Sequence, residues 1–429
     1  MSKLRIGIFG AGRGAGLGKA AVLAGAEIVA ICDFHQARLK KALESFGGEI
    51  ATYDDFDKFI EHPMDGVILA NYFHEHAPFA IKCLEKGVNV FSECISNGTM
   101  AEGVQLERAA QKSSAIYMLA ENYPNALCTR EIKKICDSGT LGKILYAEGE
   151  YNHPGDPRDL KFKKKFNYFP EHWRNYLPRT YYLTHSLCPV MAATGATPKR
   201  VSAFAVYAPE TEDVPIVTNV GDRAAVLLTQ NDDGSVFRVT GCATFGAHGN
   251  SYRVCGLNGQ VEQPRGFKDK VLLRYNAWTL PEGDVEEKLY TPSWDDEDEA
   301  LIVQTGHGGG DFMVVRKFLD CIREGKQPEF PYDVHSAVTM SSTAILAHRS
   351  MLEGGTAYEV PDFRKAEDCA KYENDYLTPF IGKHGEKPTL PCCSHPEHKP
   401  TQEQVKLYRE QVMEIDGSAQ ARGSEGVLG

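Results

Sequence analysis

The sequence lacks the long apolar runs and the basic excess that would mark two large classes of protein. No stretch of its 429 residues stays apolar over the roughly 20 positions that a membrane-spanning helix needs. Lysine and arginine number 47 against 58 acidic residues, which gives a formal net charge of −11. Nucleic acids and anionic membranes bind basic surfaces, so we expect neither as a partner. The one basic run, Lys161–Lys165, is too short to reverse this balance.

The sequence also lacks a recognisable leader segment and a regular cysteine framework. MSKLR leads directly into the strand-like IGIFGAG, without the apolar core of a secretory signal. The twelve cysteines have no dense, regular spacing, and several lie in apolar segments, such as Cys32, Cys83 and Cys321. Cysteines used in this way are typical of reduced thiols in the cytoplasm. We therefore expect a cytoplasmic protein.

Short apolar runs alternate with helical patterns over the first 122 residues. The runs that qualify as buried strands are 4–9, 27–32, 65–70, 89–92 and 115–119. Segments with helical spacing separate them, for example 77–86, which ends at Gly87. This alternation predicts a parallel sheet with helices on both faces. We therefore expect an α/β protein whose residues 1–122 form a Rossmann domain.

Longer strand-like stretches dominate the chain after Asn122. They are 144–151, 200–207, 223–228, 235–243, 252–256 and 271–275. A hairpin-like turn at Asn231–Gly234 joins two of them, and two helices, 311–324 and 335–352, follow. These patterns predict an α+β domain with an open, mainly antiparallel sheet over 123–385, and an extension over 386–429 with a polar helix at 401–415. The acidic run 295–299 is expected to be a solvated loop.

A glycine-rich segment follows the first predicted strand. It fits the G-x-G-x-x-G/A fingerprint of dinucleotide sites through Gly10, Gly12, Arg13, Gly14 and Ala15. Gly16 leaves open which residue takes the third position. Such a turn brings a pyrophosphate to the backbone and to a helix N-terminus. Asp33, after the second strand, would bind ribose hydroxyls and repel a 2′-phosphate, so we expect NAD; a glycine-rich turn for another ligand is the alternative.

Ordered motifs over residues 3–362 resemble the Gfo/Idh/MocA oxidoreductases, whose namesakes include glucose-fructose oxidoreductase and inositol dehydrogenase. The motifs that carry the resemblance are MDGVILANYFHEHAPFAIKCLEKGVNVFSE, AENY at 120–123, DSGTLGKILYAEGEY at 137–151, Trp173-Arg174 and FLDCIREGKQPEF. The resemblance implies NAD-dependent chemistry on sugars. It also implies a second-domain sheet that packs face to face between subunits, and hence a homo-oligomer.

The sequence departs from this superfamily at two motifs. Where the family has E-K-P, with a lysine beside the reacting hydroxyl, this chain has Glu93-Cys94-Ile95. Where the family's catalytic helix has D-x-x-x-H-x-x-D, this chain has Tyr181, His185 and Cys188. Only the histidine is kept, so the usual lysine-assisted reaction is not implied.

A second resemblance narrows the expectation to one branch. The segment 182–189, YLTHSLCP, is similar to the Y-x-T-H-x-L-x-P of NAD-dependent glycosidases, including α-N-acetylgalactosaminidases. GHGGGD at 306–311 matches their G-H-G-G-x-D. Gut-bacterial enzymes that oxidise C-glycosides at C3 look similar too. This resemblance implies action on whole glycosides at the ring C3.

His185 is the expected catalytic base, because imidazoles exchange protons near neutral pH. Tyr182 lies three residues earlier, on the same face if the segment is helical. An ordinary phenol titrates near pH ~10, so we expect Tyr182 to hydrogen-bond the reacting hydroxyl. A satisfied pair in the core is the alternative reading of an isolated Tyr-x-x-His.

The resemblance and residue chemistry supply two further candidate sets. For the nicotinamide end they are Asn71, His74, Glu93, Cys94, Asn122 and Arg174. For the substrate they are Cys94, Glu121, His153, Tyr181 and His307. Alternatives stay open: Cys94 as a neutral filler, Glu121 as an interface pair, Arg174 as a sugar-hydroxyl ligand or in a surface ion pair. His153 and His307 have structural roles as alternatives, and so do the aromatics of 166–182.

Three functions from different classes remain. The first is NAD-dependent oxidation of a glycoside C3 hydroxyl; the second is a glycosidase that oxidises C3 transiently. The third is a non-catalytic protein that senses NAD or sugar, since the lysine is missing. Cys392, Cys393, His395 and His398 carry zinc-type donors, but their spacing is not that of a zinc site, and no metal is expected.

Overall fold

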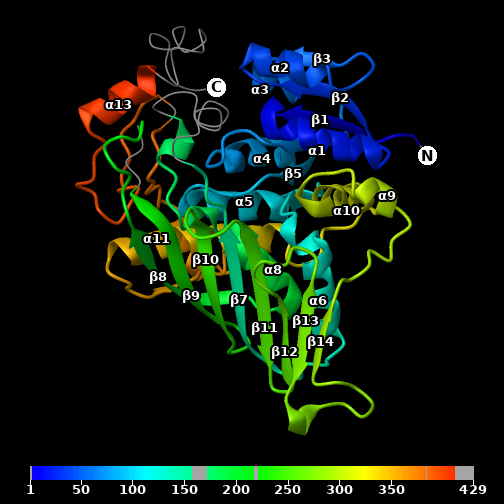
Figure 1. Ribbon diagram of the computed structural model, residues 1–429. Coiled ribbons are helices and arrows are strands. Elements are labelled where there is room, and N and C mark those ends of the chain that lie inside the picture. Colours follow the sequence, from blue (N-terminus) through cyan, green and yellow to red (C-terminus); the bar gives the residue numbers. More distant parts are fainter. Residues whose placement is uncertain (1, 157–171, 217–220, 383, 411–429) are drawn as a thin grey trace.

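The computed structural model describes residues 2–156, 172–216, 221–382 and 384–410 (Figure 1). The basic run Lys161–Lys165, several aromatics of 166–169 and residues 411–415 of the expected polar helix lie outside the described residues. Two sheets form the molecule, one above the other in Figure 1. None of the helices in the described ranges is both long and apolar enough to cross a bilayer.

The first sheet has six parallel strands in the order β3-β2-β1-β4-β5-β6. Its elements are β1 (Arg5–Phe9), α1 (Ala11–Leu23), β2 (Glu27–Cys32), α2 (Gln36–Leu43), β3 (Ala51–Tyr53), α3 (Phe56–Phe59), β4 (Gly66–Leu69), α4 (His76–Glu85), β5 (Asn89–Ser92), α5 (Met100–Lys112) and β6 (Tyr117–Leu119). The expected Rossmann arrangement is confirmed. Because the strands are parallel, their carboxyl ends share one edge, where ligands bind in such sheets.

The second sheet has nine strands in the order β14-β13-β12-β11-β7-β10-β9-β8-β15. Its strands are β7 (Ile144–Asn152), β8 (Pro198–Tyr207), β9 (Asp222–Asn231), β10 (Val236–Ala243), β11 (Gly249–Gly256), β12 (Gly259–Gln263), β13 (Val271–Tyr275), β14 (Glu287–Tyr290) and β15 (Tyr358–Glu359). The mainly antiparallel character is confirmed, with one parallel pair, β7–β10, at its centre. The turn at Asn231–Gly234 forms the β9–β10 hairpin as expected.

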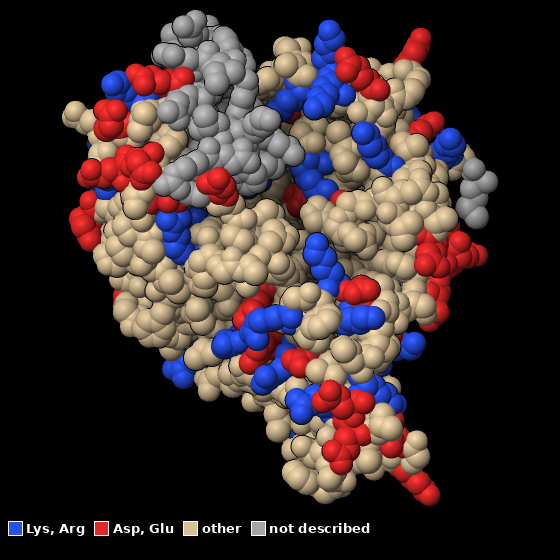
Figure 2. Space-filling model, viewed as in Figure 1, with Lys and Arg blue, Asp and Glu red and all other residues tan. Residues whose placement is uncertain are grey.

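Helices cover one face of the larger sheet and leave the other open. The helical elements after residue 122 are η1 (Tyr123–Asn125), α6 (Leu127–Asp137), η2 (Trp173–Asn175), η3 (Tyr181–Leu183), α8 (Thr184–Thr194), η4 (Ala277–Thr279), α9 (Glu299–Ile302), η5 (His307–Gly309), α10 (Gly310–Glu324), α11 (Val334–Leu352), α12 (Ala366–Tyr372) and α13 (Gln402–Tyr408). Helices α6, α8 and α11 pack against the covered face. On the open face Phe204 is 60% exposed and Leu228 50% exposed. Figure 2 shows acidic and basic side chains gathered beside uncharged surface on this side of the molecule.

Helix α10 returns to the first domain. Its residues Val314, Phe318 and Leu319 share one buried cluster with Ile6 and Ile8 of β1, and α10 packs against α1. A single cut at residue 122 therefore does not separate the two cores in space. The apolar stripe of α10 explains this return, since it is buried against the Rossmann sheet rather than the larger one.

The acidic run 295–299 is mainly an exposed loop, as expected, but two of its carboxylates are paired. Arg316 of α10 donates to Asp296 at 2.9 and 2.5 Å and to Asp298 at 2.6 Å. The hydrogen bonds from Arg316 lower the pKa of Asp296 to about 2, against the opposing effect of burial. The run is thus tied to α10, and Glu299 begins the short helix α9.

Candidate active site

The glycine-rich turn has the shape that a dinucleotide phosphate requires. Gly10 has φ +94°, and a Cβ there would lie 2.2 Å from the carbonyl oxygen of Ala70. A Cβ at Gly14 would lie 2.5 Å from the Cγ2 of Ile8, so Gly14 allows α1 to pack on β1. Gly14, rather than Ala15 or Gly16, thus has the packing role expected of the third position. Around Gly12 the nearest atom to such a Cβ is 3.8 Å away, which leaves room for a phosphate.

Asp33 lies where β2 ends, next to this turn. Its Oδ2 accepts a hydrogen bond from the backbone N–H of Ala11 at 2.8 Å, and its Oδ1 accepts one from His35 at 2.8 Å. The side chain is buried. A carboxylate has about four acceptor positions, so each oxygen keeps room for a ribose hydroxyl. The turn and Asp33 together fit a dinucleotide.

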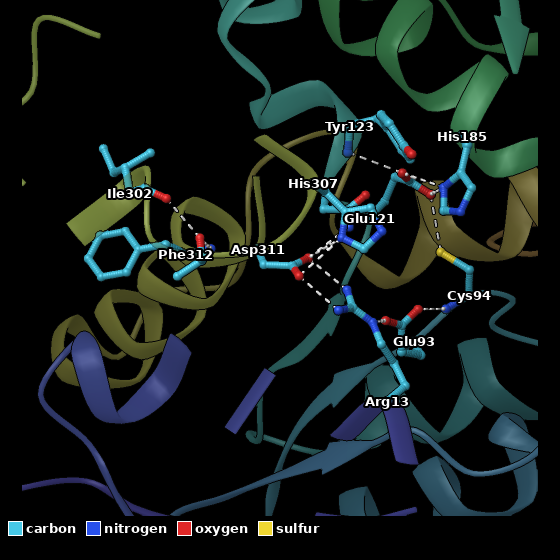
Figure 3. A network of polar contacts seen from close by, with 12 residues as sticks. Arg13, Glu93, Cys94, Glu121, Tyr123, His185, Ile302, His307, Asp311 and Phe312 are labelled. Atoms are coloured by element: carbon cyan, nitrogen blue, oxygen red, sulfur yellow. Dashed lines mark hydrogen bonds and ion pairs between the residues drawn. The ribbon is translucent and has the colours of Figure 1, made fainter. Parts of the chain in front are cut away.

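Arg13, in the first turn of α1, bridges two carboxylates (Figure 3). Its Nε donates to Glu93 Oε1 at 2.7 Å, and its two terminal nitrogens donate to Asp311 at 2.8 and 2.7 Å. Asp311 also accepts from Asn122 at 2.8 Å and lies 3.1 Å from the Nδ1 of His307. Burial would raise the pKa of Asp311, but Arg13 and His307 hold it below its usual range. Asp311 therefore stays ionised.

His307 takes an unusual backbone conformation to reach this network. Its φ is +54°, in the left-handed region that a side chain other than glycine rarely adopts. The next two residues, Gly308 and Gly309, also have positive φ. Strained backbone of this kind is often found at functional sites. The ring of His307 lies 5.8 Å from that of Tyr123, so the loop reaches the second half of the site.

His185 is paired with a buried carboxylate. Its Nδ1 lies 2.9 Å from both carboxylate oxygens of Glu121, and Glu121 is fully buried. Burial would raise the pKa of Glu121, but the charge and hydrogen bond of His185 lower it below its ordinary value. Glu121 therefore positions His185, which is a different role from the substrate contact expected for it. Figure 3 shows the two side chains pointing toward each other.

Three tyrosines surround the His185 ring. The centroid distances are 4.7 Å to Tyr123, 4.8 Å to Tyr151 and 5.0 Å to Tyr182. Burial raises the pKa of each of these phenols, so all three remain protonated hydrogen-bond donors at neutral pH. A protonated Tyr182 is compatible with the donor role expected for it. The structure brings Tyr182 and His185 together as the sequence predicts.

With this geometry in place, two family descriptions match the chain. Residues 4–121 match an oxidoreductase family with an NAD-binding Rossmann fold, and residues 247–369 match the C-terminal domain of glycosyl hydrolase 109. The first domain therefore belongs to the Gfo/Idh/MocA oxidoreductases and has their NAD-binding Rossmann fold. The second domain is similar to that of glycosyl hydrolase family 109.

The individual relatives of this chain have low sequence identity to it. A glycosyl hydrolase family 109 protein from a Shewanella species is 23% identical over 399 residues, which cover 85% of this chain and 86% of that protein. An alpha-N-acetylgalactosaminidase from Shewanella oneidensis is 23% identical over 406 residues, with the same coverage. Among solved structures, levoglucosan dehydrogenase with NADH and levoglucosan matches with a TM-score of 0.69 and 17% identity, covering 84% of this chain and all of that one. The structural likeness shows a shared fold.

Cys94 stands where this superfamily's motif has its lysine. Its Sγ donates to Glu121 Oε2 at 3.2 Å, and burial raises the pKa of the thiol well above its ordinary value. Cys94 is therefore a neutral donor to the Glu121–His185 pair. The position that holds a lysine in the family motif thus holds a neutral side chain here.

Several other expected residues lie at the margins of the site. Tyr181 corrects an expectation: it is fully buried against Phe380 and His348, so its place is in the core rather than on the substrate side. His153 stacks edge-on with His248 at 4.7 Å and lies 5.8 Å from Tyr151. His153 thus joins His248 to the group of tyrosines around His185.

Two residues expected at the nicotinamide end, Asn71 and His74, follow β4 and have different surroundings. His74 packs on Phe380 at 4.2 Å, and burial lowers its pKa to about 3, so the ring is neutral. Asn71 donates to the carbonyl of Glu75 at 3.2 Å. Its buried Oδ1 has no partner among the described residues, which leaves an acceptor for a ligand amide or hydroxyl.

An aromatic stack that the sequence analysis did not single out supports the site. Phe73 lies between Trp173 at 5.1 Å and Tyr182 at 5.5 Å, and both pairs are nearly parallel. The guanidinium of Arg174 lies 4.4 Å from the Trp173 ring. The stack joins the segment after β4 to η2 and η3. Tyr123, Tyr151 and Asp311 were missed as well, although AENY, EGEY and GHGGGD were the motifs of the resemblance.

The C-terminal segment is attached to the larger sheet by direct contacts. Ser394 donates to Asp222 from its backbone at 2.9 Å and from its hydroxyl at 2.6 Å. His395 stacks on Tyr207 at 3.7 Å, and Cys393 donates to the His395 carbonyl. In the part of the chain that the structure describes, no three or more histidine, cysteine, aspartate or glutamate side chains form a group that could hold a metal ion.

Proposed function

We propose that this protein uses NAD to oxidise the C3 hydroxyl of a sugar glycoside to a 3-keto glycoside. The observation that carries the proposal is the His185–Glu121 pair within a ring of three tyrosines. A base and a set of neutral donors next to a dinucleotide turn suit the removal of a hydroxyl proton and a hydride. When bound, NAD supplies the hydride acceptor.

The hydrogen bond to Glu121 decides which nitrogen of His185 acts. An ionised Glu121 accepts the Nδ1 proton and leaves Nε2 as a free acceptor. Nε2 can then take the proton of the sugar hydroxyl, and the buried carboxylate stabilises the imidazolium that results. This arrangement provides the charge stabilisation that a lysine at position 94 would otherwise supply.

The tyrosines bind and orient the sugar. Their phenols are donors that can hold the reacting hydroxyl and its neighbours, and their faces suit the C–H surface of a sugar ring. His153 and His307 lie on either side of Tyr151 and Tyr123, where a neighbouring hydroxyl or the aglycone would lie. Arg174, Asn71 and Asn122 fit the nicotinamide end beside Glu93.

A glycosidase reaction is the second candidate, because the match to glycosyl hydrolase family 109 favours it. In that reaction the C3 ketone acidifies the C2 proton, and the aglycone is eliminated from C1. Water then adds, and the hydride returns to C3. The first steps are the same, so His185 and Glu121 keep their roles.

Product analysis separates these candidates. Purified protein is incubated with O- and C-glycosides while nicotinamide absorbance and products are followed. A 3-keto glycoside with its aglycone still attached supports the first candidate, and aglycone release without net NADH supports the second. Binding of NAD or sugar without either product would contradict both and support a sensor.

We also propose that the open face of the larger sheet joins subunits. Phe204 and Leu228 project from neighbouring strands on this face, beside the Arg238–Glu148 ion pair. Large apolar side chains exposed together favour an interface. A Leu228→Glu variant should lower the mass measured by light scattering to that of a monomer, whereas Val303→Glu, on α9's exposed end, should not. An unchanged mass for Leu228→Glu would contradict this interface.

A further inference from the structure

The Arg13 network joins parts of the molecule that lie far apart in sequence. Arg13 lies in the first turn of α1, after the glycine-rich turn, and Glu93 follows β5. Asp311 lies in the first turn of α10, 298 residues after Arg13. Three N–H groups of one guanidinium are directed at two carboxylates (Figure 3). A two-pronged arginine–carboxylate contact of this kind is both strong and geometrically specific.

Asp311 is held as firmly as Arg13. It is buried, accepts from Asn122 and contacts His307, so its carboxylate cannot move without breaking four contacts. It also lies in the first turn of α10, where the helix dipole favours an anion. The G-H-G-G-x-D segment therefore presents a fixed anion to the arginine of the dinucleotide turn.

The ion pair lies at the edge of the first sheet where the carboxyl ends of its parallel strands meet, and dinucleotides bind at such an edge. A pyrophosphate would bind at the turn before α1, at the N-terminus of that helix. Arg13 joins this turn to Glu93 after β5, and its side chain is one-third exposed. Two carboxylates face one arginine, so Arg13 also screens an anionic ligand from Glu93 and Asp311.

We propose that Arg13 is a positioning residue, a clasp that controls the release of NAD, and that NAD leaves only when the Arg13–Asp311 ion pair opens. The inference rests on the NAD-binding first domain and does not need the proposed glycoside chemistry. Asp311 and the G-H-G-G-x-D segment then hold the cofactor in place between turnovers.

The test measures NAD exchange directly. Protein loaded with isotopically labelled NAD is mixed with excess unlabelled NAD, and the label that stays bound is followed over time. Asp311→Asn keeps the shape of the side chain but removes its charge, and we expect release roughly tenfold faster or more. Arg316→Ala is the matched control, because it breaks a two-pronged ion pair on the same helix, with Asp296, away from the turn. It should leave the release rate unchanged.

Asp311→Asn also separates the clasp from simple charge repulsion. Removing an anion near the phosphates would slow release if charge alone mattered, but should speed release if the ion pair is a clasp. Arg13→Lys, which keeps the charge but cannot bind both oxygens in the same way, should release NAD faster as well. Release from Asp311→Asn at the wild-type rate or slower overturns the clasp, whether or not the wild-type protein is found to oxidise glycosides.

Discussion

The two halves of the site use charge in different ways. In the cofactor half, Arg13, Glu93 and Asp311 form a network of ion pairs, and each charge has a partner. In the substrate half, one buried carboxylate faces one histidine, and the remaining groups are neutral phenols and a thiol. The first arrangement fixes geometry, and the second leaves a single site for a proton. Cofactor binding and proton transfer thus depend on residues from separate elements of the fold.

The largest effect is expected from His185→Ala. It removes the proposed general base, so kcat/KM should fall roughly a thousandfold, as is usual for loss of a general base. The measurement is steady-state oxidation of a glycoside that the wild-type protein accepts. NAD retention should stay at the wild-type level, since the cofactor half is intact. Full activity in this variant would contradict the assignment.

Asp311→Asn is expected to cost about 2 kcal/mol of stability at neutral pH, because it removes the buried carboxylate that pairs with both terminal nitrogens of Arg13 and leaves only Glu93 as a partner. The folded-state pKa of Asp311 is lowered, so its contribution is fully present above the unfolded pKa, near 3.8. It is lost progressively as the pH falls from there toward the lower folded-state pKa, so part of it is lost at pH 3. Denaturant unfolding at pH 7 and pH 3 measures this difference. Asp320→Asn, whose partner Arg323 is on the surface, should change stability by less than about 0.5 kcal/mol. An equal loss at both pH values would argue against the ion pair.

Glu121→Gln should lower kcat by about ten- to a hundredfold while His185 is still present. The amide cannot stabilise an imidazolium, so the acidic limb of the pH–rate profile should move to lower pH. Rates across a pH series measure this shift. Glu102→Gln is a suitable control, since Glu102 is a half-buried, hydrogen-bonded carboxylate that caps α5. An unshifted profile in Glu121→Gln would show that the carboxylate has only a structural role.

The smallest effect distinguishes two adjacent tyrosines. Tyr182→Phe should lower kcat/KM by roughly tenfold, the value of one hydrogen bond to a reacting group. Tyr181→Phe should leave it within about twofold, since Tyr181 is in the core and its hydroxyl has no partner among the described residues. Equal losses of kcat/KM in both variants would indicate that Tyr181 contacts the substrate.

Much of the fold could be predicted from the sequence. The alternation of apolar runs and helical spacing in 1–122 indicated the parallel sheet, and strands with regular patterns, such as β7 and β10, were found. The short strands β3, β12 and β14 were missed, because three to five residues of mixed polarity carry little periodicity. The packing of α10 on the first domain was missed, because an apolar stripe on a helix does not indicate which sheet the helix packs against.

The site was predicted by residue type but not by pairing. His185, Tyr182, Glu93 and Asn122 belong to motifs, so their places could be expected. The partners of Glu121 and Asp311 lie 64 and 298 residues away, and no local pattern reports such contacts. Cys94 likewise was expected to face substrate or fill space, whereas its contact is with Glu121.

The central claim is that hydride chemistry occurs at C3 of a glycoside. The most direct measurement uses a glycoside deuterated at C3. After one incubation the protein is denatured, and the released dinucleotide is analysed by mass spectrometry. Where the 3-keto product is released, the predicted result is deuterium on the nicotinamide. Where the ketone is reduced again, the deuteride returns to C3, and the predicted result is deuterium kept at C3 of the sugar and a dinucleotide without label. Release of a 3-keto glycoside with no deuterium on the nicotinamide, or loss of the C3 deuterium to solvent, would contradict the account.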